Sequence, residues 1–170
     1  MSMSESARPT VVIGLGNPLM ADDGLGLAAV ARLQETWQLP ESVEVVDGGT
    51  WGMNLLPVIE DAGRVLLVDA IATGAAPGTL HALERDRIPR YLATKISPHQ
   101  VDLRDVLALA ELRGTLPAQT VAIGLEPAVV ELSNSLTDTL RVRLDDLVAE
   151  IVAQLGRWGV TCTAVEPMHA

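Results

Sequence analysis

Acidic side chains follow several apolar runs of this sequence, and a histidine precedes a later amphipathic segment. They are Asp22 and Asp23 after residues 10–14, Asp47 after residues 43–46, Asp69 at the end of residues 64–69, and His99 within residues 97–100. Carboxylate oxygens and an imidazole nitrogen form a mixed ligand set that zinc or nickel accepts. The types of these residues therefore point to metal-dependent or acid–base chemistry.

Asp23, Asp69 and His99 could together form a hydrolytic site. If Asp23 and Asp69 approach one another, their like charges raise one of the two pKa values unless a cation lies between them. A divalent metal provides that neutralisation, and three protein ligands leave coordination positions open. The residues alone thus suggest a metal-assisted hydrolase.

Each of these residues also has an ordinary structural explanation. Asp22 or Asp23 can cap a helix, Asp69 can simply end a strand, and His99 beside a proline can be a surface or capping residue. What favours a site is that the acids and the histidine occur together next to predicted strand ends and helix starts. His81, by contrast, is predicted to point outward from a strand and is a poor ligand candidate.

Short apolar runs alternate with amphipathic segments along the chain. We expect strands at residues 10–14, 43–46, 64–69, 79–83 and 120–125, and helices at about 24–38, 53–59, 101–112 and 136–155. The last helix has a plausible cap at Ser135 or Thr137 and a stop at Gly156. This order predicts an α/β fold with a mostly parallel sheet covered on both faces, whose functional groups lie beyond the carboxyl ends of the strands.

Length and composition narrow the class of protein. The 170 residues fit a single domain, 1–170, with flexible tails expected at 1–9 and about 157–170. A formal charge of -10 disfavours a nucleic-acid partner, and no apolar run is long enough to span a membrane. The single cysteine, Cys162, excludes an internal disulfide and a cysteine-based zinc cluster. These features predict a cytoplasmic protein.

Five segments together resemble the hydrogenase maturation endopeptidase family. They are GLGNPLMADDGLG at residues 14–26, VDGGT at 46–50, DAIATGAAPGTL at 69–80, KISPHQ at 95–100 and LALAELRGTLPAQTVAIGLEP at 107–127. The resemblance implies a three-layer α/β/α sandwich with a mostly parallel, twisted central sheet. It also implies an endopeptidase that removes the C-terminal extension of the [NiFe] hydrogenase large-subunit precursor after nickel insertion.

The resemblance assigns roles to particular residues. The metal-binding positions of the family fall on Asp23, Asp69 and His99, where family members carry either glutamate or aspartate at the position of Asp23. The nickel would belong to the substrate, although the isolated protein could hold another divalent metal. Asp22 would have a supporting or capping role, and we count it with Asp47, Gly48, Gly49 and Thr50 as a candidate for lining the substrate cleft.

Two other functions share some of these features. A nickel-binding assembly chaperone for the large subunit would carry similar ligands but would cleave no peptide bond. The segment GLGNP also resembles the start of peptidyl-tRNA hydrolases, but the elements that follow it in that family are missing and the acidity disfavours tRNA. The sequence leaves open whether Asp23 or Asp69 activates water, and whether the metal is catalytic or serves only in recognition.

Overall fold

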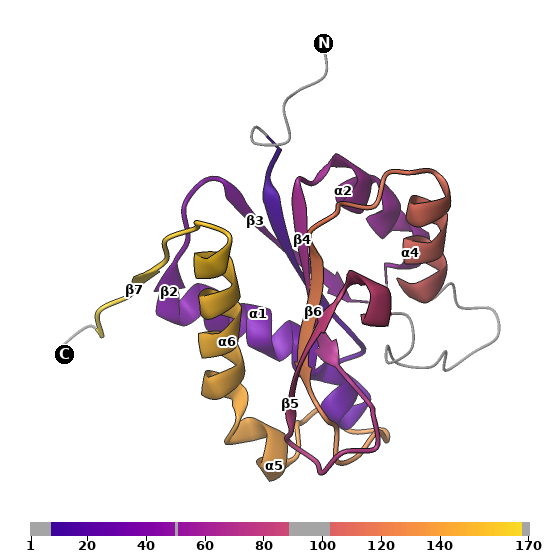
Figure 1. The fold of residues 1–170 in the computed structure, drawn as a ribbon. Helices are drawn as coiled ribbons and strands as arrows, with labels where there is room; N and C mark the ends of the chain where they lie inside the picture. The colour runs from indigo at the N-terminus through magenta and orange to yellow at the C-terminus, as the bar shows by residue number, and fades with distance from the viewer. Residues whose placement is uncertain (1–7, 50, 89–102, 168–170) are drawn as a thin grey trace.

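A sheet of five strands forms the centre of the computed structural model, which describes residues 8–49, 51–88 and 103–167 (Figure 1). The strands are β1 (Thr10–Leu15), β3 (Val43–Gly49), β4 (Arg64–Ala70), β5 (Leu80–Glu84) and β6 (Thr120–Leu125). Their order is β3-β1-β4-β6-β5, and all neighbours pair in parallel except β5, which is antiparallel to β6. The predicted α/β fold with a mostly parallel sheet is confirmed.

The strands β1 and β4 are apolar along most of their length because both of their faces are covered. In β1, Val11 and Ile13 face one hydrophobic core, whereas Val12 faces the other. The same alternation occurs in β4, where Leu67 and Leu66 belong to opposite cores. Side chains of a strand point alternately to its two faces, so a strand that is buried on both faces carries apolar residues on each of them.

Helices form the two outer layers (Figure 1). On one face lie α1 (Leu25–Thr36) and α6 (Leu144–Arg157), and on the other lie α2 (Leu55–Asp61) and α4 (Leu103–Leu112). Short 3-10 turns, Ala21–Gly24, Gly52–Asn54 and Arg85–Arg87, lead into or out of these elements. The three-layer arrangement expected from the resemblance is therefore present. None of the helices in the described ranges is both long and apolar enough to cross a membrane.

The prediction of one long C-terminal helix was wrong. The structure has a short helix, α5 (Asp138–Arg141), followed by α6, so the chain turns between them. Thr137 precedes α5 but makes no side-chain cap, because its hydroxyl group bonds to Asp22 instead. Gly156 lies inside α6, and the chain leaves the helix at Gly159, whose φ of 82° is the left-handed conformation typical of a helix stop.

Part of the segment predicted to be a C-terminal tail belongs to the folded structure. Thr163–Ala164 form β7, which pairs antiparallel with β2 (Trp37–Gln38), residues that we had placed at the end of the first helix. Val160 and Cys162 pack against the core between the sheet and α1 and α6. Where α1 ends, and what structure follows α6, thus depend on contacts between segments that are far apart in the sequence. Residues 1–7 of the predicted N-terminal tail lie outside the described residues.

Candidate functional site

Asp23 lies just beyond the carboxyl end of β1. After Leu15 the chain turns at Gly16, whose φ is +117°, and returns to the sheet edge in the 3-10 turn Ala21–Gly24. The Asp23 side chain is 8% exposed, and its Oδ2 accepts a hydrogen bond of 3.0 Å from the backbone N–H of Asn17. Burial raises the pKa of Asp23, and the Asn17 hydrogen bond opposes part of that rise.

Asp69 stands near the end of β4, the strand beside β1. It is 6% exposed, and its Oδ1 accepts a 2.8 Å hydrogen bond from the N–H of Ala70. Burial, together with the negative charge of Asp23, raises the pKa of Asp69 to about 8. The structure therefore brings these two predicted site residues close enough for their charges to repel.

Gly16 makes this approach of the two acidic residues possible. A Cβ atom at this position would lie 1.8 Å from the carbonyl oxygen of Asp23 and 3.5 Å from Oδ1 of Asp69. No side chain fits in that space, and the positive φ also favours glycine. Gly16 therefore allows the loop that carries Asp23 to pack closely against the end of β4.

The third predicted ligand, His99, lies outside the described residues, as does Thr50. Within the described ranges, no group of three or more histidine, cysteine, aspartate or glutamate side chains is arranged to hold a metal ion. The predicted set of Asp23, Asp69 and His99 thus stays a prediction, of which the structure places the two carboxylates together.

Asp22 has a different environment from its neighbour. Its side chain is fully buried, and its carboxylate accepts hydrogen bonds from the N–H groups of Ala128, Val129 and Thr137 and from the Thr137 hydroxyl group, at 2.8 to 3.0 Å. It caps neither the 3-10 turn nor α1. A buried carboxylate with these partners cannot line a cleft, so our inclusion of Asp22 among the cleft candidates was wrong. Its supporting role consists of joining the loop after β1 to the loop after β6.

The last residues of β3 lie beside the loop after β1. Asp47 is exposed, Gly48 is buried, and Gly49 has a φ of +42°. The pairing register of β1 and β3 shifts at this point, and the N–H of Gly16 donates to the carbonyl oxygen of Gly49. Asp47, Gly48 and Gly49 therefore stand at the same sheet edge as Asp23, as the prediction of a substrate cleft requires.

A second buried cluster at this edge was missed by the sequence reasoning. Glu126, directly after β6, is 5% exposed and accepts hydrogen bonds from the N–H groups of Thr73 and Gly74 and from Nε2 of His81, at 2.9 to 3.1 Å. Burial raises the pKa of Glu126, but these hydrogen bonds outweigh it and lower the pKa. Glu126 had the same signal as Asp69, an acid that ends an apolar run.

His81 is part of this cluster, so its expected outward orientation was wrong. Its side chain is 14% exposed, because it turns toward Glu126. The hydroxyl of Thr73 lies 3.4 Å from Nε2 of His81, the same nitrogen that meets Glu126. A nucleophilic triad needs the two ring nitrogens for different partners. This cluster instead holds the loop after Asp69 in place, through the bonds of Thr73 and Gly74 to Glu126.

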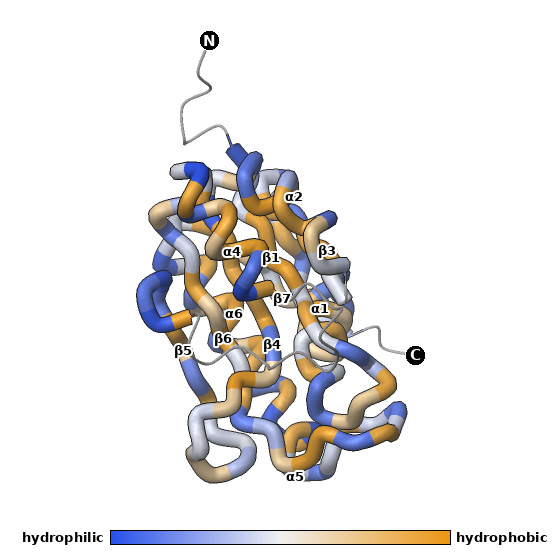
Figure 2. Tube along the Cα trace, turned by 90° about the vertical axis from the view of Figure 1, so that its right-hand side faces the viewer, coloured by the Kyte–Doolittle hydropathy of each residue, from blue (hydrophilic) through white to orange (hydrophobic). Residues whose placement is uncertain are grey.

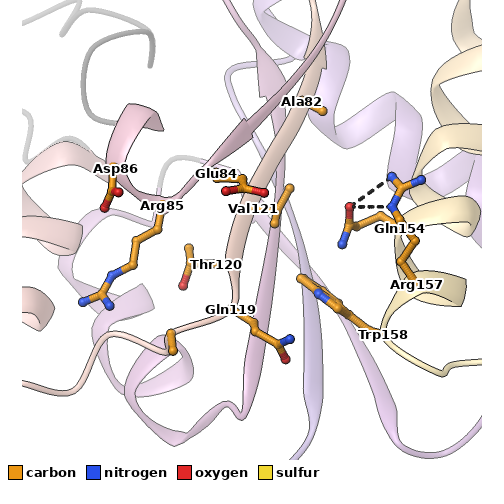
Figure 3. Close-up of a pocket in the computed structure, with 11 residues that line it drawn as sticks. Ala82, Glu84, Arg85, Asp86, Gln119, Thr120, Val121, Gln154, Arg157 and Trp158 are labelled. Atoms are coloured by element: carbon orange, nitrogen blue, oxygen red, sulfur yellow. Dashed lines mark hydrogen bonds between the residues drawn. The ribbon is translucent and has the colours of Figure 1, made fainter.

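A separate pocket of about 670 Å³ lies at the other end of the sheet, between β5, β6 and α6 (Figure 3). Thr120, at the start of β6, lines it together with Gln154, Arg157 and Trp158. Arg157 is hydrogen-bonded to Gln154. The length of β6 separates this pocket from the edge that holds Asp69, so it is not part of the candidate site.

The fold is that of a known class of proteases. Residues 27–154 match the family model described as hydrogenase maturation protease. The chain belongs to the hydrogenase maturation protease family and is an endopeptidase. This assignment contradicts the peptidyl-tRNA hydrolase alternative.

Individual relatives agree with this assignment over most of their length. The hydrogenase expression/formation protein HupD of Rhodobacter capsulatus is 39% identical over 155 residues, which cover 90% of this chain and 74% of that protein. The hydrogenase 2 maturation protease of Escherichia coli is 34% identical over 160 residues, covering 94% and 98%. The solved structure of the hydrogenase maturating endopeptidase HybD from E. coli superposes with a TM-score of 0.85 at 33% identity, covering 92% of this chain and 97% of that one.

Proposed function

We propose that this endopeptidase removes the C-terminal extension of a [NiFe] hydrogenase large-subunit precursor after nickel has been inserted. We propose further that Asp23, Asp69 and His99 recognise the nickel of that substrate. The observation that carries the proposal is the pair of buried, mutually repelling carboxylates at the ends of β1 and β4. The family of the chain and the names of its relatives support the choice of substrate.

The proposed roles follow from the chemistry of the two carboxylates. Two neighbouring acids in a poorly hydrated site favour a cation between them, and carboxylate oxygens are suitable donors to it. In this proposal the substrate supplies the cation, so a precursor without nickel does not bind at the site. One carboxylate then accepts a proton from the water molecule that attacks the scissile carbonyl group, and this proton passes to the leaving amine nitrogen when the C–N bond breaks.

The test is the intact mass of the precursor after incubation with the protein. Nickel-loaded and nickel-free precursor are each mixed with wild-type protein, Asp23→Asn, Asp69→Asn or His99→Ala. Asp61→Asn is the matched control, because Asp61 is exposed and ends α2 at the opposite edge of the sheet. We expect loss of one C-terminal peptide only from nickel-loaded precursor, and only with wild-type protein and the control.

Each part of the proposal can fail separately. Equal cleavage of nickel-free precursor would refute recognition of the metal. Full activity of Asp23→Asn or Asp69→Asn would refute the assignment of the site. Tight binding of the precursor without a change of mass would favour the assembly-chaperone alternative over cleavage by this chain.

A further inference from the structure

Exposed apolar residues lie on the loop that carries Asp23 and on the loop after β6. They are Leu19, Val130 and Leu132, and we call them together the Leu19–Leu132 surface. Leu19 is 58% exposed and Leu132 is 84% exposed. Large apolar side chains that remain exposed close together often mark a site of protein interaction.

A parallel bridge joins the two segments that carry Leu19 and Leu132. The N–H of Ser133 donates to the carbonyl oxygen of Leu19, and the N–H of Ala21 donates to the carbonyl oxygen of Ser133, which is a parallel bridge between Met20 and Ser133. Leu19 directly precedes Met20, and Leu132 directly precedes Ser133, so the two exposed leucines lie on adjoining segments.

This surface is held in place by the buried carboxylate of Asp22. That carboxylate binds the N–H groups of Ala128 and Val129 from one segment, while Asp22 itself belongs to the other. The loop after β6, drawn in orange, lies at the same end of the molecule as α5 in Figure 1, and Figure 2 colours parts of the loops at that end as hydrophobic. A fixed apolar surface loses little conformational entropy when a partner binds.

Two hydrogen bonds connect the surface to the candidate site. The N–H of Leu19 donates to Oδ1 of Asn17 at 2.9 Å, and the N–H of Asn17 donates to Oδ2 of Asp23 at 3.0 Å. An endopeptidase must receive a protein chain at its catalytic groups. A substrate that reaches Asp23 therefore meets the Leu19–Leu132 surface next to it.

We infer that the Leu19–Leu132 surface binds apolar side chains of the substrate segment adjoining the scissile bond. This inference rests on the proposed function, because it takes the large-subunit precursor as that substrate. The surface contributes to substrate affinity, whereas the carboxylates perform the reaction. Replacing the leucines should therefore raise KM and leave kcat nearly unchanged.

The test compares the double variant Leu19→Ser/Leu132→Ser with Leu112→Ser. Leu112 is a matched control because it is 85% exposed, and it ends α4 at the opposite edge of the sheet. Cleavage of nickel-loaded precursor gives kcat and KM. Binding of the same precursor is measured separately with the two substitutions placed in an Asp23→Asn background, and circular dichroism confirms the fold of each variant.

We expect the double variant to raise both KM and the Kd at least tenfold, with kcat within twofold of wild type, because the burial of two leucines is lost. Leu112→Ser should resemble wild type. An unchanged Kd, an equal effect of Leu112→Ser, or a fall in kcat alone would overturn the inference. So would self-association of the wild-type protein that the double variant abolishes, because a second copy would then cover the surface.

The two proposals fail in different ways. If wild-type protein cleaves no precursor, the proposed function fails, while the binding measurement still decides whether the surface binds this partner. If wild-type protein cleaves normally and the double variant has the same KM, only the inference about the Leu19–Leu132 surface fails.

Discussion

Replacement of Asp22 by alanine should destabilise the protein strongly, although Asp22 is not a proposed catalytic residue. Its buried carboxylate accepts hydrogen bonds from the backbone N–H groups of Ala128, Val129 and Thr137. A buried donor that loses its acceptor costs about 1 to 3 kcal/mol. Ala128 is exposed, so water can replace part of what is lost there. Taking the low end of that range for each of the three donors gives a loss of about 3 kcal/mol.

Urea denaturation followed by circular dichroism measures this loss. The unfolding free energy depends on urea by about 1 to 3 kcal/mol per molar, so a loss of about 3 kcal/mol should lower the midpoint by roughly 1 to 3 M. Hydrogen exchange should show faster exchange of the N–H groups of Val129 and Thr137. The control is Asp61→Ala, which removes an exposed carboxylate. If the midpoint of Asp22→Ala stays within about 0.3 M of wild type, the carboxylate does not hold the two loops together.

Three further predictions concern the same edge of the sheet. Gly16→Ala should abolish cleavage and lower the free energy of unfolding by about 2 to 4 kcal/mol, because the added Cβ collides with the backbone of Asp23. Asp69→Asn should remove a pH dependence of stability, as measured by urea unfolding with a chelator at pH 5, 6 and 7. The pKa of Asp69 is about 8 in the folded protein and 3.8 in the ordinary exposed state, so between these pH values the folded protein binds one more proton than the unfolded chain. The free energy of unfolding therefore falls as the pH rises, by about 1.4 kcal/mol per pH unit. Glu126→Ala should lower the unfolding free energy by about 2 to 4 kcal/mol and speed hydrogen exchange at Thr73, which loses its acceptor.

Controls separate these effects from general damage. Gly114 also has a positive φ, but a Cβ there has no neighbour within 4 Å, so Gly114→Ala should retain full activity. If the unfolding free energies of wild type and Asp69→Asn change equally with pH, the raised pKa of Asp69 is contradicted. Glu84 is exposed near the other end of β5, and a loss of stability in Glu84→Ala equal to that in Glu126→Ala would contradict the role of the buried cluster.

The class of fold and the two central acids could be predicted from local sequence. Runs such as residues 10–14 and 64–69 are apolar without alternation, which is typical of strands buried on both faces. Asp23 and Asp69 lie next to such runs, and parallel neighbours end at the same edge of a sheet. The resemblance of the motifs added the family, which the comparisons confirmed. His99 stays a prediction of the sequence.

What local sequence could not predict depends on contacts between distant segments. Asp22 and Asp23 are neighbours of the same type, yet one is bonded to residues more than 100 positions away and the other faces Asp69. Glu126 and His81 are 45 positions apart, so neither residue shows from its own surroundings that the other will turn it inward.

The sequence by itself determined the mostly parallel sheet and the acids at its edge, because periodicity and strand ends are local properties, and its motifs carried the resemblance to the family. Only the tertiary structure decided which acid is buried and hydrogen-bonded to a distant loop, where the last helix breaks, and that the segments of Leu19 and Leu132 adjoin. In each of these cases the partner lies far along the chain, and burial and hydrogen bonding exist only once the chain has folded.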